Sequence, residues 1–181
     1  MQSIGFLEFN SIAKGIEAAD AVIKAADVQL MFAKAGCPGK YYLLFHGEVA
    51  AVQSSLDAGE MIGGKHVVDH CVIPRVHPQV IRAIGMANMP GATGAIGVME
   101  FYSVTASIYG ADAAVKAADV ELIDVRLGTG IGGKSFVTLT GDVAAVTEAI
   151  RCGTSTPNAE GMLVSSVVIP NPAPELFQSL L

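Results

Sequence analysis

The sequence predicts an α+β fold that is repeated twice along the chain. Residues 4–30 and 96–122 are identical at 15 of 27 aligned positions, where ordinary residue usage gives about two by chance. Each copy alternates short apolar runs, typical of strands, with longer segments of helical periodicity. We therefore predict a first domain over 1–88, a linker over 89–95 and a second domain over 96–181.

Later segments of the two copies also match in the same order. They are Gly39-Lys40 with Gly133-Lys134, Gly47–Val52 with Gly141–Val146, and Val72–Pro74 with Val168–Pro170. The offset between the copies grows along the chain, so the second copy has gained a few residues in its loops. Each copy is expected to run strand, helix, strand, strand, helix, strand.

The elements of the first copy follow from length, spacing and capping signals. The expected strands are 3–9, 28–32, 41–45 and 67–73, and the expected helices run from 12 to about 26 and from 48 to 58. Ser11 is typical of an N-cap. Asp20 and Lys24 lie four residues apart, as do Asp112 and Lys116 in the second copy, and both pairs are expected on the outer helix face.

Composition excludes several classes of protein. The chain is 51% hydrophobic and 15% charged, and its mean hydropathy of +0.50 predicts that apolar surface is buried between subunits. The net charge of −6 argues against nucleic-acid binding. No apolar run reaches the roughly 20 residues needed to cross a membrane, and no secretion signal is visible. Three cysteines without paired spacing fit a reducing cytoplasm.

The segment Gly128–Ser135 satisfies both the phosphate-loop pattern and the dinucleotide-binding pattern. Both mechanisms need a helix N-terminus after the loop, whereas Ser135–Thr140 alternates like a strand. The first copy has Lys34–Lys40 in the same place and breaks both patterns. We interpret the loop as a hairpin connection that needs backbone freedom, with a nucleotide-binding enzyme as an alternative.

Cys37 is the most informative single residue, because it lies on a glycine loop between two predicted strands. Cys71 and Cys152 have ordinary packing explanations in a strand and at a helix end. One cysteine per chain cannot hold zinc or an iron–sulfur cluster, which take about four ligands. A threefold axis through the loop would bring three thiols together, and an inert thiol is the other reading.

No combination of nucleophile, base and orienting group can be assembled from the sequence. The four histidines show no spacing typical of a metal site, and Glu8 and Glu100 occupy equivalent places in their first strands. A lone glutamate in a strand is more often a structural hydrogen-bond partner than a general base. We therefore expect a protein that is not an enzyme.

These residues together resemble the bacterial microcompartment shell domain, in its unpermuted form, which is a ferredoxin-like variant. The motifs that carry the resemblance are Ile4-Gly5-x-x-Glu8, Ala19-Asp20 to Val28, the Gly-Lys loop, Gly47–Val52 and Val72–Pro74, each present twice. Tandem members of this family form trimers that imitate a hexagonal tile. The resemblance therefore implies a homotrimeric pseudohexamer in a microcompartment shell, beside hexameric and pentameric tiles and, as further partners, encapsulated redox enzymes.

The resemblance also implies roles for individual residues. The loops that line the central pore would be Gly36, Cys37, Pro38 and Gly39 in the first copy and Gly128, Thr129, Gly130, Ile131 and Gly132 in the second. The Cys37 loop is similar to that of the tandem shell proteins of propanediol-utilisation microcompartments, which implies one [4Fe–4S] cluster per trimer, held by three copies of Cys37. Lys24, Lys116 and Arg75 would join neighbouring tiles; Asn171 replaces the arginine in the second copy.

Three other functions are kept as alternatives. The same tile could have an open pore that conducts metabolites, with Cys37 as a lining thiol. A duplicated α+β domain could also serve as a small-ligand-binding regulator, which would form a trimer without sheets. A nucleotide-binding enzyme that uses Gly128–Ser135 would lose nucleotide affinity on Lys134→Ala.

Overall fold

The computed structural model describes residues 3–86, 88, 90–91 and 94–180. Its internal contacts divide the chain into two compact units, Met1–Val76 with Thr129–Gly133 and His77–Gly128 with Lys134–Leu181. The predicted linker 89–95 includes residues 89, 92 and 93, which lie outside the described residues. The domain boundaries at 88 and 96 stay predictions.

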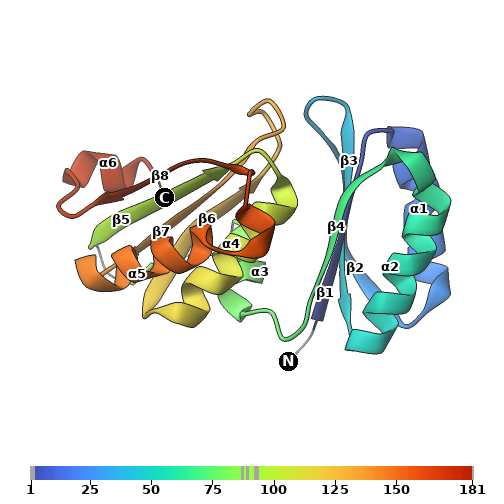
Figure 1. Cartoon of the computed structure of the whole chain (residues 1–181), viewed down its shortest axis with the longest axis horizontal. Coiled ribbons are helices and arrows are strands. Elements are labelled where there is room, and N and C mark those ends of the chain that lie inside the picture. Colours follow the sequence, from blue (N-terminus) through green and yellow to red (C-terminus); the bar gives the residue numbers. More distant parts are fainter. Residues whose placement is uncertain (1–2, 87, 89, 92–93, 181) are drawn as a thin grey trace. The chain divides into compact units, whose positions relative to one another are not determined.

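The first repeat forms a four-stranded antiparallel sheet with two helices on one face (Figure 1). Its elements are β1 (Ser3–Phe9), α1 (Ile12–Ala25), β2 (Val28–Gly36), β3 (Lys40–Gly47), α2 (Val49–Gly63), the 3₁₀ turn η1 (Gly64–His66) and β4 (Val67–Ile73). The strand order is β2-β3-β1-β4, so β1 lies in the interior of the sheet and pairs with both β3 and β4.

The second repeat has the same order of elements. They are β5 (Ala95–Phe101), α4 (Val104–Ala117), β6 (Val120–Leu127), β7 (Ser135–Gly141), α5 (Val143–Thr154), the 3₁₀ turn η2 (Pro157–Ala159) and β8 (Leu163–Ile169). Its strand order, β6-β7-β5-β8, repeats that of the first sheet. The predicted α+β fold of two tandem domains is confirmed.

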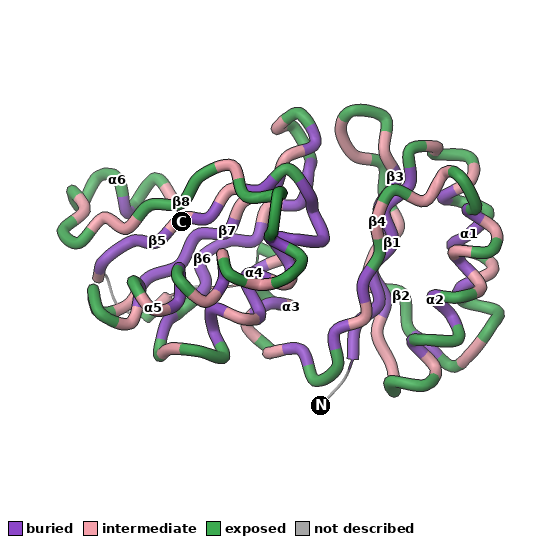
Figure 2. The backbone as a smooth tube through the Cα atoms, in the orientation of Figure 1, coloured by how far each residue is buried: buried purple, intermediate pink, exposed green. Residues whose placement is uncertain are grey.

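Strand β1 shows how alternation distributes residues between the two sides of the sheet. Leu7 and Phe9 belong to the core that the sheet forms with α1 and α2, together with Val22 and Leu56. The intervening side chains, Glu8 among them, point to the other face and are also buried. Figure 2 shows this burial along β1 and β3, in contrast to the exposed outer sides of the helices.

Helix α1 approaches the sheet through small residues. Ser11 caps it by accepting a hydrogen bond from the Lys14 N–H at 3.4 Å, as predicted. Its buried residues are Gly15, Ala18, Ala19 and Val22. The isoleucines at 12, 16 and 23 lie on the exposed side instead. A Cβ atom at Gly15 would lie 2.5 Å from the Tyr41 ring, so only glycine fits this contact.

One short helix follows the last strand of each repeat, and neither was predicted from the sequence. They are α3 (Pro78–Ile84) and α6 (Pro174–Gln178), and each begins with proline at a first-turn position, where its missing N–H costs nothing. Strand β2 also continues to Gly36, beyond the predicted residue 32, because Phe32–Gly36 keep their pairing with β3 across Lys40–Leu44. Helix α2 likewise runs to Gly63 rather than 58.

We predict that Gly15→Ala lowers the free energy of unfolding by about 1–3 kcal/mol, the usual cost of overpacking a core, although alanine is the better helix former. The change would be measured as a shift in the urea unfolding midpoint. Gly85→Ala is the matched control, because a Cβ there would meet no atom closer than 3.4 Å. A stability of Gly15→Ala equal to that of the parent would contradict this account of the helix–sheet contact.

Candidate functional site

Cys37 lies at the tip of the hairpin that joins β2 to β3, as the sequence predicted. Strand β2 ends at Gly36 and β3 begins at Lys40, so the turn contains only residues 37–39. The Gly39 N–H donates to the Gly36 carbonyl at 3.0 Å, and Gly39 has φ +80°, which favours glycine. The thiol of Cys37 is half-buried. The turn is therefore short, and a hydrogen bond within its own backbone closes it.

The side chain of Tyr42 supports this turn from β3. Its hydroxyl donates a hydrogen bond to the Cys37 carbonyl at 3.2 Å, and its ring lies against Gly36, where a Cβ atom would clash with it. Tyr42 is fully buried. This burial, with smaller contributions from the charges of Glu8 and Cys37, raises the pKa of the Tyr42 phenol, which therefore stays a hydrogen-bond donor.

An ion pair between Glu8 and Lys40 joins the central strand to the end of the same turn. Glu8 is 1% exposed. Burial raises the pKa of Glu8, and the neighbouring ammonium of Lys40 opposes that rise. In the second repeat Lys134 pairs with Glu100 at 2.6 Å, and this hydrogen bond raises the pKa of Lys134. Each strand glutamate is thus the partner of a lysine at the start of the strand paired with its own: Lys40 begins β3, and Lys134 directly precedes β7.

The loop between β6 and β7 has no helix after it. Gly128, Gly130, Gly132 and Gly133 all have positive φ, between 60° and 81°, so the loop needs the backbone freedom of glycine. The strand β7 follows directly, and the Ser135 hydroxyl is buried and donates to the Ser103 carbonyl at 2.7 Å. A phosphate loop would need a helix N-terminus and a free hydroxyl here. The nucleotide-binding alternative is therefore wrong.

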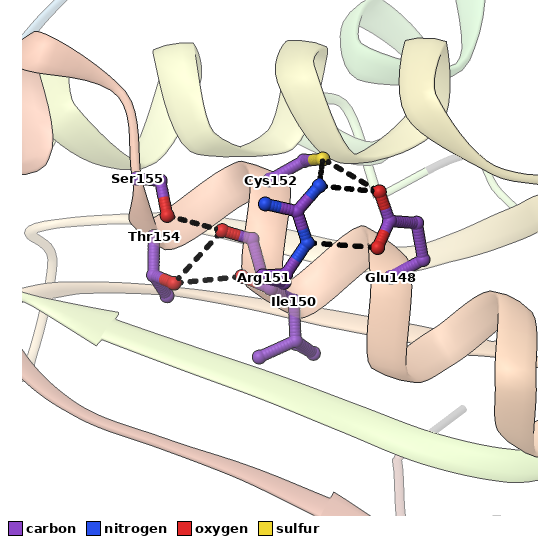
Figure 3. Close-up of polar contacts among 6 residues, drawn as sticks. All are labelled: Glu148, Ile150, Arg151, Cys152, Thr154 and Ser155. Carbon is purple, nitrogen blue, oxygen red and sulfur yellow. Dashed lines mark hydrogen bonds and ion pairs between the residues drawn. The ribbon is translucent and has the colours of Figure 1, made fainter.

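The other two cysteines lie in a strand and on a helix, not in a turn. Cys71 is buried in β4, and burial raises the pKa of its thiol. Cys152 lies on α5 beside Glu148 and Arg151 (Figure 3), with Sγ 3.3 Å from the Glu148 carboxylate, and burial is the first cause of its raised pKa. Neither thiol is therefore favoured as a thiolate ligand.

The remaining contacts in Figure 3 are structural. The Arg151 guanidinium donates two hydrogen bonds to Glu148, at 2.8 and 2.6 Å, and these lower the pKa of Glu148 to about 2. The pair lies on the exposed side of α5 and spans one helical turn.

Among the residues that the structure describes, no group of three or more histidine, cysteine, aspartate or glutamate side chains could hold a metal ion.

The two lysines predicted at the tile edge have different surroundings. Lys24 is 73% exposed and pairs with Asp20 at 2.6 Å. Lys116 is 43% exposed, and its partner Asp112 is buried and also accepts a hydrogen bond from the His77 N–H at 2.8 Å. The expectation that both pairs lie on an outer face is thus confirmed for the first repeat and wrong for Asp112. Arg75 is exposed and has φ +50°.

The segment after β4 covers the outer edge of β6. Gln79 in α3 accepts from the Leu122 N–H at 2.8 Å and donates to the Val120 carbonyl at 3.1 Å, and Asn88 donates to the Leu122 carbonyl at 2.6 Å. Among the described residues, no side chain makes such a bond to Leu30, the counterpart of Leu122. Leu30 is 39% exposed, whereas Leu122 is fully buried.

Helix α1 repeats this difference. Ile16 is 55% exposed, whereas its counterpart on α4, Ile108, is fully buried. We call the exposed residues Ile12, Ile16, Ile23 and Leu30 the α1–β2 surface. It is the counterpart, in the first repeat, of the region that α3 covers in the second.

No helix of the described residues is long and apolar enough to cross a membrane.

Two antiparallel α+β domains in tandem, with the same strand order in both sheets, define a duplicated domain. The BMC domain matches residues 3–76 and 95–172, and the chain belongs to this family. It is 41% identical over 179 residues, 99% of this chain and 97% of the relative, to the bacterial microcompartment shell protein PduT of Citrobacter freundii. It is 28% identical to the carboxysome assembly protein CcmO of a Synechococcus strain, over 98% of this chain and 68% of that protein.

Solved structures agree with this assignment. A microcompartment protein from Desulfitobacterium hafniense superposes with a TM-score of 0.91 at 50% identity, over 98% of this chain and 99% of that chain. The fused permuted hexameric shell protein MSM0275 superposes with a TM-score of 0.63 at 26% identity, over 84% and 81%. The protein is a bacterial microcompartment shell protein with two tandem BMC domains, as the resemblance implied.

We predict that Lys40→Met lowers the free energy of unfolding by about 3 kcal/mol, because it leaves the buried Glu8 carboxylate without its partner. Lys134→Met is the matched control and should cost much less, because its partner Glu100 is partly exposed. The readout is chemical denaturation at several pH values.

The pH dependence follows from the sign of the shift. Burial raises the pKa of Glu8 in the folded state above its value in the unfolded chain, so stability is lost as the pH rises through this interval and Glu8 ionises. Loss of Lys40, which lowers this pKa, makes the ionised Glu8 more destabilising. The deficit of Lys40→Met should therefore shrink as the pH falls and Glu8 becomes protonated. A deficit that stays constant with pH would contradict the role of the ion pair.

Proposed function

We propose that this protein is a structural tile, not an enzyme, which forms a homotrimeric pseudohexamer whose central pore holds one [4Fe–4S] cluster through three copies of Cys37. The observation that carries the proposal is the half-buried thiol at the tip of a short, supported turn in only one of the two repeats. Bound there, the cluster would supply one-electron transfer or be delivered to encapsulated redox enzymes.

The donor set fits such a cluster. A thiolate is the usual ligand of an iron–sulfur cluster, and three symmetry-related copies of Cys37 supply three, leaving one iron for a ligand from outside the protein. Of the three cysteines, Cys37 is the one that lies in a turn and away from a core. A site built from one chain is not supported, since the described residues of one chain contain no metal-binding group.

The trimer is supported by the α1–β2 surface. In the second repeat, α3 covers the edge of β6 and packs on α4. We expect the equivalent surface of the first repeat to be covered in a similar way. A second copy of the chain would cover the α1–β2 surface in a head-to-tail contact, and such a contact closes into a ring when the rotation fits. Three chains with two domains each then give six similar wedges.

Contacts between tiles are assigned to Lys24, Lys116 and Arg75, with other hexameric and pentameric shell proteins as neighbours. Lys24 supports this assignment best, because its side chain is 73% exposed and its only ion-pair partner in the described residues is the neighbouring Asp20. A pair that lies open to water contributes about 0–1 kcal/mol, so the ammonium can exchange Asp20 for a group on a neighbouring tile at little cost.

The same tile with an open, metabolite-conducting pore is the second candidate. It is favoured by the glycines of the β6–β7 loop, four of which have positive φ. Such a loop, built from Gly128, Thr129, Gly130, Ile131 and Gly132, presents mostly backbone to the pore. In this version Cys37 is a lining thiol, and the cluster is absent.

Native mass spectrometry of protein purified without oxygen tests the cluster and the trimer together. We expect a trimer that carries the mass of one Fe4S4 unit, with that mass lost in Cys37→Ser and kept in Cys152→Ser, the matched control. A bare trimer in the parent would move the assignment to the open pore. A monomer would overturn the tile itself.

The edge assignment has a separate test. We predict that Lys24→Ala combined with Lys116→Ala abolishes sheet or tube formation, seen by negative-stain electron microscopy, while the trimer remains intact. Lys14→Ala is the control, because Lys14 is also an exposed lysine of α1 that pairs with a neighbour, Glu17, at 2.7 Å. Normal assembly of the double variant would show that these lysines do not join tiles.

A further inference from the structure

The hairpin that carries Cys37 differs from its counterpart in one supporting side chain. Tyr42 lies opposite Glu8 in the pairing of β1 with β3, and Phe136 lies opposite Glu100 in the pairing of β5 with β7. Since Glu8 and Glu100 are equivalent in the repeat, Tyr42 and Phe136 occupy the same register position. The two positions differ by a hydroxyl, and the hydroxyl is present where the turn carries a cysteine.

The Tyr42 hydroxyl has a fixed position because the ring is held on two sides. The ring stacks on Phe6, with centroids 6.0 Å apart and an interplanar angle of 28°. On another side it lies against the backbone of Gly36, where any larger residue would displace it. The side chain is fully buried. A ring fixed in this way directs its O–H to one acceptor, the Cys37 carbonyl at 3.2 Å.

We infer that Tyr42 is a positioning residue for the Cys37 thiol, and the inference rests on the proposed function of that thiol as a cluster ligand. The hydrogen bond fixes the carbonyl of Cys37 and so restricts the rotation of the backbone from which Sγ projects. Three thiolates must bind one cluster at the same time, so a mobile Cys37 in one chain would weaken the binding of the cluster by all three. The same bond gives the Cys37 carbonyl, next to the ligand, a hydrogen-bond partner.

The second repeat shows that the hydroxyl is dispensable for folding. Strand β7 has Phe136 at this position and keeps the full pairing with β5, so Tyr42→Phe should fold. Its matched control is Tyr41→Phe, which removes a hydroxyl from the adjacent residue, whose side chain belongs to the core on the helix side of the sheet. Any effect confined to Tyr42→Phe is then an effect of the bond to Cys37.

The test compares parent, Tyr42→Phe and Tyr41→Phe in two assays. In anaerobically purified trimer, the visible absorbance of the cluster is followed after addition of an iron chelator. In protein stripped of iron, the rate of Cys37 alkylation by iodoacetamide is measured by mass spectrometry. We expect Tyr42→Phe to lose its cluster about fivefold faster and to alkylate Cys37 at a rate changed by a similar factor, the effect of one net hydrogen bond. Tyr41→Phe should match the parent in both.

The two assays separate this inference from the proposed function. A parent without a cluster, whose alkylation rate still changes in Tyr42→Phe alone, would support positioning of the thiol and overturn the cluster. A parent with a cluster, and equal chelation and alkylation rates in all three proteins, would overturn the role of Tyr42 and keep the cluster. An equal effect of both tyrosine substitutions would show a general loss of stability and also overturn it.

Discussion

The buried ion pair between Glu8 and Lys40 couples the central strand of the first sheet to the hairpin that carries Cys37. Strand β1 pairs with β3 and β4 and packs on both helices, so its position is fixed from several sides. The buried carboxylate that β1 carries, Glu8, needs a partner, and that partner, Lys40, begins β3 directly after the turn. The position of the turn is therefore tied to the core of the sheet. The second repeat keeps the same constraint with Glu100 and Lys134.

Duplication lets the two domains share one fold while their loops and surfaces differ. Both repeats share the sheet order and the strand glutamate, but only the first has a thiol in its β2–β3 turn and a tyrosine hydroxyl behind it. The surfaces differ in the same way, since Ile16 is exposed where Ile108 is buried. A symmetric hexamer of single domains would place six equal loops around a pore, whereas a tandem chain places three loops of one kind and three of another. A ligand set of three cysteines suits the second arrangement.

The duplication and the order of helices and strands along the chain could be predicted, because identical residues recur at matching places and short apolar runs alternate with longer segments of helical periodicity. The short helix α3 was missed, because seven residues starting at Pro78 carry too little periodicity to signal a helix. The exposure of Ile12 and Ile16 could not be predicted, since helical spacing alone does not say which face of the helix meets the sheet. In the structure, the face with the small residues Gly15 and Ala18 meets the sheet. The contact of Tyr42 with Cys37 depends on strand register, and the sequence could have indicated it only through the exchange of Tyr42 for Phe136.

A cluster shared by three chains would link cofactor binding to assembly. Each chain contributes one thiol, and the described residues of one chain offer no other metal-binding group, so the affinity for the cluster would exist only in the trimer. Binding to one oligomeric state stabilises that state by mass action. In the proposed trimer, the cluster would hold the ring together from its axis, and the α1–β2 surface would do so at the interfaces between chains. Rigid turns strengthen this coupling, because a ligand that is already in place pays less entropy on binding, and the hydrogen bond from Tyr42 supplies that rigidity in each chain.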